Sequence, residues 1–181
     1  MILVYTESEE GKFKKIALEA VSYAKGIADM IGTTVTAVSI NGGDSADLGN
    51  YGASKVLEVV DNSLENFNAE AYTNVISQAA KKEGASIVIL TSSANSKFMA
   101  PLVSVNLEAG YVANVTQLPT SASPFLVKHS VFTNKAFSIT EITTETKVIG
   151  LAKNAFGLKE SSVNVTSESF APELNPHNFD V

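Results

Sequence analysis

The sequence predicts a three-layer, Rossmann-like α/β domain, in which a mostly parallel sheet is flanked by helices and followed by an antiparallel hairpin section. Two patterns predict it. Up to residue 110, strand-like and helix-like segments alternate, which is typical of parallel strands joined by helical crossovers. Beyond it, four strand-like segments follow one another across short turns, which favours antiparallel pairing. A length of 181 residues, 45% of them apolar, suits one domain with a sizeable core.

The first part of the chain supplies four strands and three helices. The strands are expected at residues 1–6, 33–40, 54–60 and 86–90, which are rich in apolar and β-branched residues. The helices are expected at residues 14–31, 69–83 and 97–109, each ending at a glycine (Gly32, Gly84 and Gly110). Pro101 is expected in the first turn of the third helix, where a missing N–H costs little. Residues 41–52 are expected to be a loop with room for one short helical turn.

The second part of the chain supplies the antiparallel section. Its four strand candidates span residues 111–118, 125–132, 135–142 and 147–153. Residues 133–135 and 143–146 are expected to be hairpin turns. The last stretch holds one more possible strand and two prolines, so we expect a domain over residues 1–165 and a tail or linker over residues 166–181.

Composition narrows the possible partners. The net charge is −6, and all 13 basic residues are lysines. Without the planar fork of arginine, an acidic chain is a poor candidate for binding nucleic acid. No apolar stretch approaches the roughly 20 residues of a membrane span. The lack of cysteine and of a secretion signal favours a cytoplasmic protein.

A small polar loop behind the fourth strand is the best candidate for a binding site. Small polar loops that lead into a helix often hold a phosphate on backbone N–H groups and the helix dipole. Lys97 would add a positive charge, but helix capping by Asn95 or Ser96 is the commoner role of such a loop. The residues of this candidate nucleotide pocket are Thr6, Thr91, Ser92, Ser93 and Asn95.

Other polar residues predict no catalytic or metal site. The loop ESEEGK (7–12) stands where nucleotide folds bind phosphate, but its three glutamates would repel one. Asp61, after the third strand, is expected to be a solvated acid before a turn. His129 and His177 have no His or Cys partner at metal-ligand spacing. We therefore expect no metal, no catalytic residues and no enzyme activity of this chain alone.

Three stretches share the order of their features with one known family. The opening strand and acidic turn are the first stretch. The second joins a buried strand, a polar loop and an apolar helix through Lys97, Ala100-Pro101, Ala109-Gly110 and Asn114-Val115-Thr116. The third is a hairpin and closing strand with Asn134-Lys135-Ala136 and Asn154-Ala155-Phe156. Together they resemble the amino-terminal domain of the electron transfer flavoprotein α subunit over nearly the whole chain.

This resemblance implies an electron carrier. The whole protein would pass electrons from flavin dehydrogenases to a quinone-linked acceptor, with FAD bound by a second domain whose motifs are missing after Phe156. The implied partner is the electron transfer flavoprotein β subunit, whose corresponding domain holds AMP. The α-type domain would be a scaffold with a vestigial pocket. The family often has arginine where this chain has Leu102, Lys128 and Lys153, so contacts that need a planar fork are lost.

Two other classes of protein are alternative interpretations of the sequence. A stand-alone adenine-nucleotide-binding module of the universal-stress-protein type would need a glycine-rich phosphate loop after the fourth strand, where this chain has Ser-Ser-Ala-Asn. A receiver domain would place its phosphorylation site at Asp61, but a lysine after the fifth strand is missing.

We predict that the purified chain is colourless, because its loops offer no cradle for an isoalloxazine ring. A visible absorption spectrum of the purified chain tests this. Flavin bands near their usual positions would contradict the expectation that FAD is bound only in the full-length protein.

Overall fold

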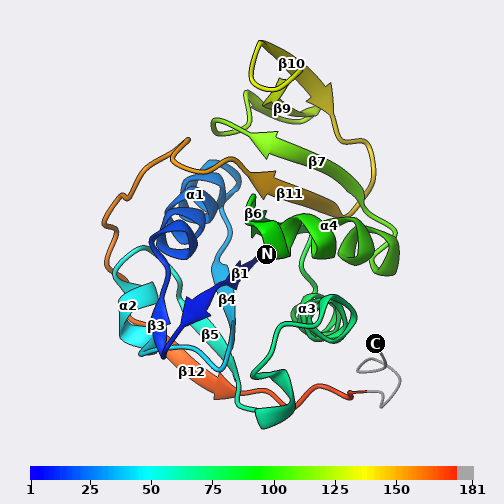
Figure 1. Cartoon of the computed structure of the whole chain (residues 1–181). Coiled ribbons are helices and arrows are strands. Elements are labelled where there is room, and N and C mark those ends of the chain that lie inside the picture. Colours follow the sequence, from blue (N-terminus) through cyan, green and yellow to red (C-terminus); the bar gives the residue numbers. More distant parts are fainter. Residues whose placement is uncertain (175–181) are drawn as a thin grey trace.

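A twisted, mostly parallel sheet forms the middle layer of the molecule (Figure 1). The computed structural model describes residues 1–174. The strand order is β10-β9-β7-β11-β6-β1-β4-β5-β12, and the fold class expected from the sequence is confirmed. The strands on this path are β1 (Ile2–Thr6), β4 (Val35–Ile40), β5 (Lys55–Val59), β6 (Ile87–Thr91), β7 (Gly110–Val115), β9 (Phe125–Val131), β10 (Ala136–Glu141), β11 (Lys147–Leu151) and β12 (Thr166–Ser169).

Three short strands lie off this path. β8 (Ser121–Ala122) pairs with β9, and β2 (Ser8–Glu9) pairs with β3 (Lys12–Phe13) in a separate small hairpin. The two-stranded β2–β3 hairpin occupies the acidic turn after β1. It therefore holds that turn against the edge where β1 ends.

Helices cover both faces of the sheet, and the cores follow the alternation of side chains along the strands. Ile2 and Val4 of β1 pack with α1 (Lys15–Ile31) and α2 (Ser45–Gly49). Leu3 and Tyr5 face the other way and pack with α3 (Ala69–Glu83) and α4 (Ala94–Asn106). A short 3₁₀ helix, η1 (Asn62–Leu64), follows β5. None of the helices within residues 1–174 is both long and apolar enough to cross a membrane.

The first two long helices agree with the sequence prediction. α3 has the expected bounds, and α1 begins one residue later than expected. Both end at a glycine in the left-handed region, Gly32 with φ 67° and Gly84 with φ 63°, where a side chain would strain the backbone. Asn68 caps α3 by accepting hydrogen bonds from two backbone N–H groups.

The predictions for α4 need correction. The helix starts at Ala94, with Ser93 as its N-cap, so Pro101 lies inside the helix and not in its first turn. The helix ends at Asn106, and Gly110 is the first residue of β7. Gly110 serves close packing instead, because a Cβ there would lie 2.7 Å from Cγ2 of Ile142.

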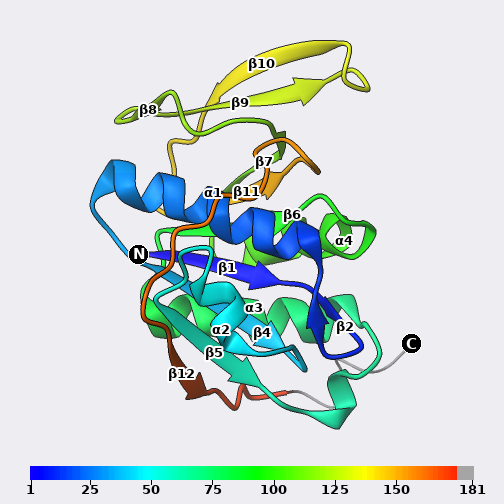
Figure 2. The ribbon, with the colours of Figure 1, turned by 90° about the vertical axis from the view of Figure 1, so that its left-hand side faces the viewer.

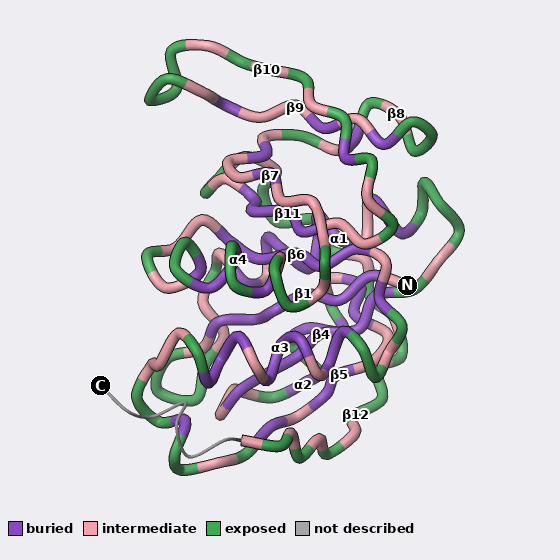
Figure 3. The backbone as a smooth tube through the Cα atoms, turned by 90° about the vertical axis from the view of Figure 1, so that its right-hand side faces the viewer, coloured by how far each residue is buried: buried purple, intermediate pink, exposed green. Residues whose placement is uncertain are grey.

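The predicted antiparallel section is only partly antiparallel. β11 pairs in parallel with both β6 and β7, so β7 and β11 belong to the parallel part. Residues 143–146 are therefore no hairpin turn, since β10 pairs with β9 and the chain then returns to the sheet interior. Val148 and Ile149 are fully buried. A continuously apolar segment of this kind suits an inner strand that is covered on both faces of the sheet. The β9–β10 hairpin with its turn at 133–135 is confirmed, and it stands apart from the helical layers (Figures 2 and 3).

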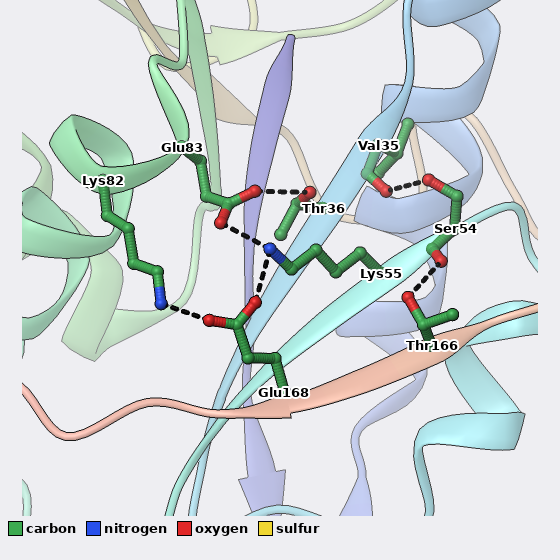
Figure 4. A network of polar contacts seen from close by, with 8 residues as sticks. All are labelled: Val35, Thr36, Ser54, Lys55, Lys82, Glu83, Thr166 and Glu168. Atoms are coloured by element: carbon green, nitrogen blue, oxygen red, sulfur yellow. Dashed lines mark hydrogen bonds and ion pairs between the residues drawn. The ribbon is translucent and has the colours of Figure 1, made fainter.

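Part of the expected tail joins the sheet. β12 pairs in parallel with β5 as the edge strand, and an ionic network holds it (Figure 4). Lys55 on β5 lies 2.7 Å from the carboxylates of both Glu83 and Glu168, and Lys82 also pairs with Glu168. The hydrogen bonds from Lys55, and then from Lys82, lower the pKa of Glu168 to about 2. The boundary at residue 165 remains a prediction.

Acidification is expected to loosen β12. The folded pKa of Glu168, about 2, lies below its ordinary value of 4.5, so folding favours the carboxylate. Its stabilising contribution is complete above the ordinary pKa and is lost as the pH falls through the folded pKa. Hydrogen exchange of the Phe170 amide, which donates to the Glu58 carbonyl at 2.8 Å, reports on this strand. Glu168→Gln should reduce its protection several-fold at neutral pH, whereas the exposed Glu160→Gln should not. Equal protection in both variants would contradict a role of the network in holding β12.

Candidate functional site

The sheet has its topological switch point between β1 and β6. From β1 the chain proceeds to β4 and β5 on one side, whereas β6 and β11 lie on the other. β1 pairs in parallel with both β4 and β6, so the carboxyl ends of these strands meet at one edge (Figure 2). In open α/β sheets, ligands bind outside the carboxyl ends at such a point. The residues just after Thr6 and Leu90 are therefore the first place to look for a site.

A buried carboxylate fills this place. One oxygen of Glu7, which follows β1, accepts hydrogen bonds from the hydroxyls of Thr91 at 2.5 Å, Ser93 at 2.6 Å and Ser96 at 2.9 Å. Glu7 is 5% exposed, and Ser96 is fully buried. The Ser93 hydroxyl also accepts from the Ser96 N–H at 3.0 Å, which caps α4. Glu7 therefore sits as an anion among the hydroxyls that open the helix.

This arrangement does not fit the phosphate groups of a nucleotide or flavin. Phosphates bind at helix starts because hydroxyls, N–H groups and the helix dipole favour negative charge there. Here the three hydroxyls already donate to the Glu7 carboxylate. A phosphate at the same position would lose these donors and would also meet a like charge. The Glu7 carboxylate thus occupies the position that an anionic ligand would take.

The sequence-predicted pocket residues are only partly brought together. Thr91 and Ser93 join Glu7, as described above. The Thr6 hydroxyl instead donates to the Val38 carbonyl at 3.0 Å, and the Ser92 hydroxyl donates to the Leu151 carbonyl at 2.7 Å. Asn95 lines the neighbouring cavity. The expected capping role falls to Ser93, and neither Asn95 nor Ser96 is the N-cap.

Sequence reasoning missed Glu7 and Ser96 as members of this cluster. From the sequence, the three glutamates after β1 are expected to repel phosphate. The signal that points to Glu7 is its position directly after β1. The loop after β6, the parallel neighbour of β1, is rich in Ser and Thr and can supply donors to it. Of the other two, Glu10 is exposed, and Glu9 lies 3.4 Å from Lys14.

An acidic cavity of about 730 Å³ opens beside the cluster, at the carboxyl ends of β1, β4 and β5. Glu7, Glu9 and Glu10 line it, together with Tyr5 and Tyr72. The two tyrosine rings meet edge to face at 6.2 Å. Burial first, and then the negative charge of Glu7, raise the pKa of Tyr5 well above its ordinary value. The tyrosine therefore stays neutral. The lining holds four glutamates, Glu7, Glu9, Glu10 and Glu65, and one lysine, Lys14, so its net negative charge disfavours a phosphate.

A second buried carboxylate fixes the loop after β11. Glu19 of α1 is 3% exposed and accepts hydrogen bonds from the backbone N–H groups of Asn154, Phe156 and Gly157 at 2.8–3.0 Å. Phe156 also meets the ring of Tyr23 edge to face at 5.4 Å. The loop of residues 154–157 is thereby held on α1.

The remaining candidates have structural roles. Asp61 caps η1 by accepting from the Ser63 N–H and hydroxyl, and these hydrogen bonds, the hydroxyl first, lower its pKa. His129 lies in β9, where its Nε2 is 2.9 Å from the hydroxyl of Thr140 on the facing strand. His177 lies outside the described residues. Within residues 1–174, no group of three or more His, Cys, Asp or Glu side chains could hold a metal ion.

Fold and site together define a doubly wound α/β domain of the nucleotide-binding type, with its switch point closed by an internal carboxylate. A family model described as the electron transfer flavoprotein domain matches residues 2–172. The chain therefore belongs to the electron transfer flavoprotein domain family. This family consists of electron carriers, and the resemblance seen in the sequence is confirmed.

The curated relatives are subunits of larger assemblies by name. The chain is 32% identical to the electron transfer flavoprotein subunit alpha of Megasphaera elsdenii, over 65% of this chain and 36% of that protein. It is 30% identical to the subunit of the same name from Thermoanaerobacterium thermosaccharolyticum, over 70% and 39%. It is 22% identical to the acryloyl-CoA reductase electron transfer subunit beta of Anaerotignum propionicum, over 96% and 44%. The chain thus spans less than half the length of each of these relatives.

Removing the Glu7 carboxylate is expected to destabilise the fold. Glu7→Ala should lower the free energy of unfolding by about 3 kcal/mol, because three hydroxyls, those of Thr91 and Ser96 buried and that of Ser93 half-buried, lose their acceptor at about 1 kcal/mol each. Glu7→Gln keeps an acceptor oxygen and should cost about 1 kcal/mol, mainly through the lost charge. Urea unfolding followed by circular dichroism measures both values.

Glu10→Gln is the matched control, since it removes one negative charge from an exposed position of the same loop. We expect its effect to stay within about 0.5 kcal/mol. If Glu7→Ala proves no more destabilising than this control, the cluster is not what stabilises the edge.

Proposed function

We propose that this chain is the scaffold domain of an electron transfer flavoprotein α-type subunit, which pairs with a β-type subunit and supports a separate FAD domain. The observation that carries the proposal is the Glu7 carboxylate at the switch point. It leaves the switch point without a place for the phosphates of a nucleotide or of FAD. Within a family of electron carriers, such a domain serves by supporting and pairing rather than by holding the redox group.

The relatives support the α-type assignment. Two of them are named subunit alpha, and this chain matches only 36% and 39% of their length. FAD would then be bound in the full-length protein by the part that this chain lacks. Electrons would come from flavin dehydrogenases through the whole complex, and the complex would act in the cytoplasm. In this proposal residues 1–165 are the scaffold and residues 166–181 lead towards the FAD domain.

An apolar stripe on α4 is the surface that we assign to the pairing. Phe98, Leu102 and Val105 are spaced by four and three residues, so they share one face of the helix. Their exposed fractions are 69%, 41% and 75%. A contiguous apolar stripe of this kind on a helix is typical of a surface that another protein covers.

Pairing can be tested by co-expressing this chain with the β-type electron transfer flavoprotein subunit of the same organism. We expect the two chains to co-elute in size-exclusion chromatography. The double variant Phe98→Lys/Val105→Lys should weaken the pairing at least tenfold, because two charges would be buried in an apolar contact. Its melting temperature should stay close to that of the unmodified chain, since both side chains are exposed.

Val60→Lys is the matched control, because Val60 is 86% exposed and follows β5, outside the apolar stripe. It should pair as well as the unmodified chain does. Separate elution of the unmodified chain and the β-type subunit at micromolar concentrations would overturn the proposed pairing. Equal loss in the control and in the double variant would overturn only the choice of surface.

A further inference from the structure

A second cavity lies on the other side of the loop that follows β6. It measures about 610 Å³, which is within the usual range of small-molecule sites. Ser92, Thr116 and Ala152 line it, and they follow the three adjacent parallel strands β6, β7 and β11. The β9–β10 hairpin supplies the facing wall. The cavity therefore lies at the carboxyl edge of the sheet, but outside the switch point that Glu7 fills.

Three lysines converge on this cavity. Lys97 comes from the first turn of α4, Lys128 from β9 and Lys153 from the loop after β11. No Asp or Glu lines the cavity, and within residues 1–174 none of the three lysines has a carboxylate within 4.0 Å. In a chain with a net charge of −6, three uncompensated positive charges around one cavity create a local field that attracts anions.

Neutral donors without a partner complete the lining. Ser130 of β9 is only 7% exposed, and its hydroxyl makes no hydrogen bond with the described part of the chain. This hydroxyl is accessible from the cavity, so it is free to donate a hydrogen bond to a ligand there. The side-chain amides of Asn114 and Gln117 also line the cavity and have no protein partner within residues 1–174.

The chemistry of these donors favours phosphate. Lysine is a compact point charge, and it binds phosphate in that way in many proteins. Three point charges around a cavity suit an anion that carries several negative charges and presents its oxygens in several directions. Phe137, 60% exposed, adds an aromatic wall whose ring lies 4.6 Å from the Lys128 ammonium.

We propose that this cavity is a binding site for a small anion with two linked phosphates, held by Lys97, Lys128, Lys153 and the Ser130 hydroxyl. Free pyrophosphate and a nucleoside diphosphate share this chemistry. The base of a nucleotide would in addition contact Phe137. The site is separate from the position filled by Glu7, and it does not depend on pairing with a β-type subunit.

Isothermal titration calorimetry of the 181-residue chain with sodium pyrophosphate, ADP and adenosine tests the proposal. We expect saturable binding of pyrophosphate and ADP that weakens as salt is added, and no binding of adenosine. Lys153→Gln should weaken both at least tenfold, and Ser130→Ala several-fold. Tighter binding of ADP than of pyrophosphate, lost in Phe137→Ala, would identify a nucleotide as the ligand, whereas equal binding would identify the phosphates alone.

Lys135→Gln is the matched control, because Lys135 is exposed on the same hairpin and does not line the cavity. It should bind pyrophosphate as the unmodified chain does. The proposal is overturned if neither phosphate compound binds at low salt. It is also overturned if Lys135→Gln weakens binding as much as Lys153→Gln, since the charge effect would then be diffuse.

Discussion

One buried carboxylate fixes the centre of this molecule, at the point where the two wings of the sheet meet. Glu7 leaves β1, and its three hydroxyl donors come from the loop after β6 and from the first turn of α4. A buried carboxylate without partners would cost several kcal/mol, so these donors must all turn towards it. The end of β1, the loop after β6 and the cap of α4 are thereby set together. The place that a nucleotide phosphate takes in related folds is occupied from within.

Glu19 forms a similar cluster at the same carboxyl edge of the sheet, but with backbone N–H groups as donors. Each carboxylate fixes one wall of the lysine-lined cavity. Glu7 positions the loop that carries Lys97, and Glu19 positions the loop just after Lys153. At this edge, two internal acids hold the loops in place, while Lys97, Lys128 and Lys153 have no carboxylate partner within residues 1–174. The buried carboxylates of Glu7 and Glu19 therefore fix the loops next to Lys97 and Lys153.

The sequence predicts well what depends on local pattern. The bounds of α3 follow from its spacing, from Asn68 and from Gly84. What it could not predict depends on distant contacts. β11 lies between β6 and β7, and the short turn before it carries no sign that the chain returns to the interior of the sheet. β12 joins the sheet through Lys55 and Glu168, which lie far apart in sequence. The pairing of Glu7 with Ser96 is non-local in the same way.

The loop of residues 91–97 separates two opposite environments. On one side lies the acidic cavity with Glu7, and on the other lie the lysines around the second cavity. Lys97 belongs to the basic side, and its neighbour Phe98 begins the apolar stripe of α4. A protein that covers the stripe would remove water next to Lys97 and change the electrostatic strength of the cavity. If both proposals hold, pairing and anion binding are energetically linked, and each changes the affinity of the other by the same factor.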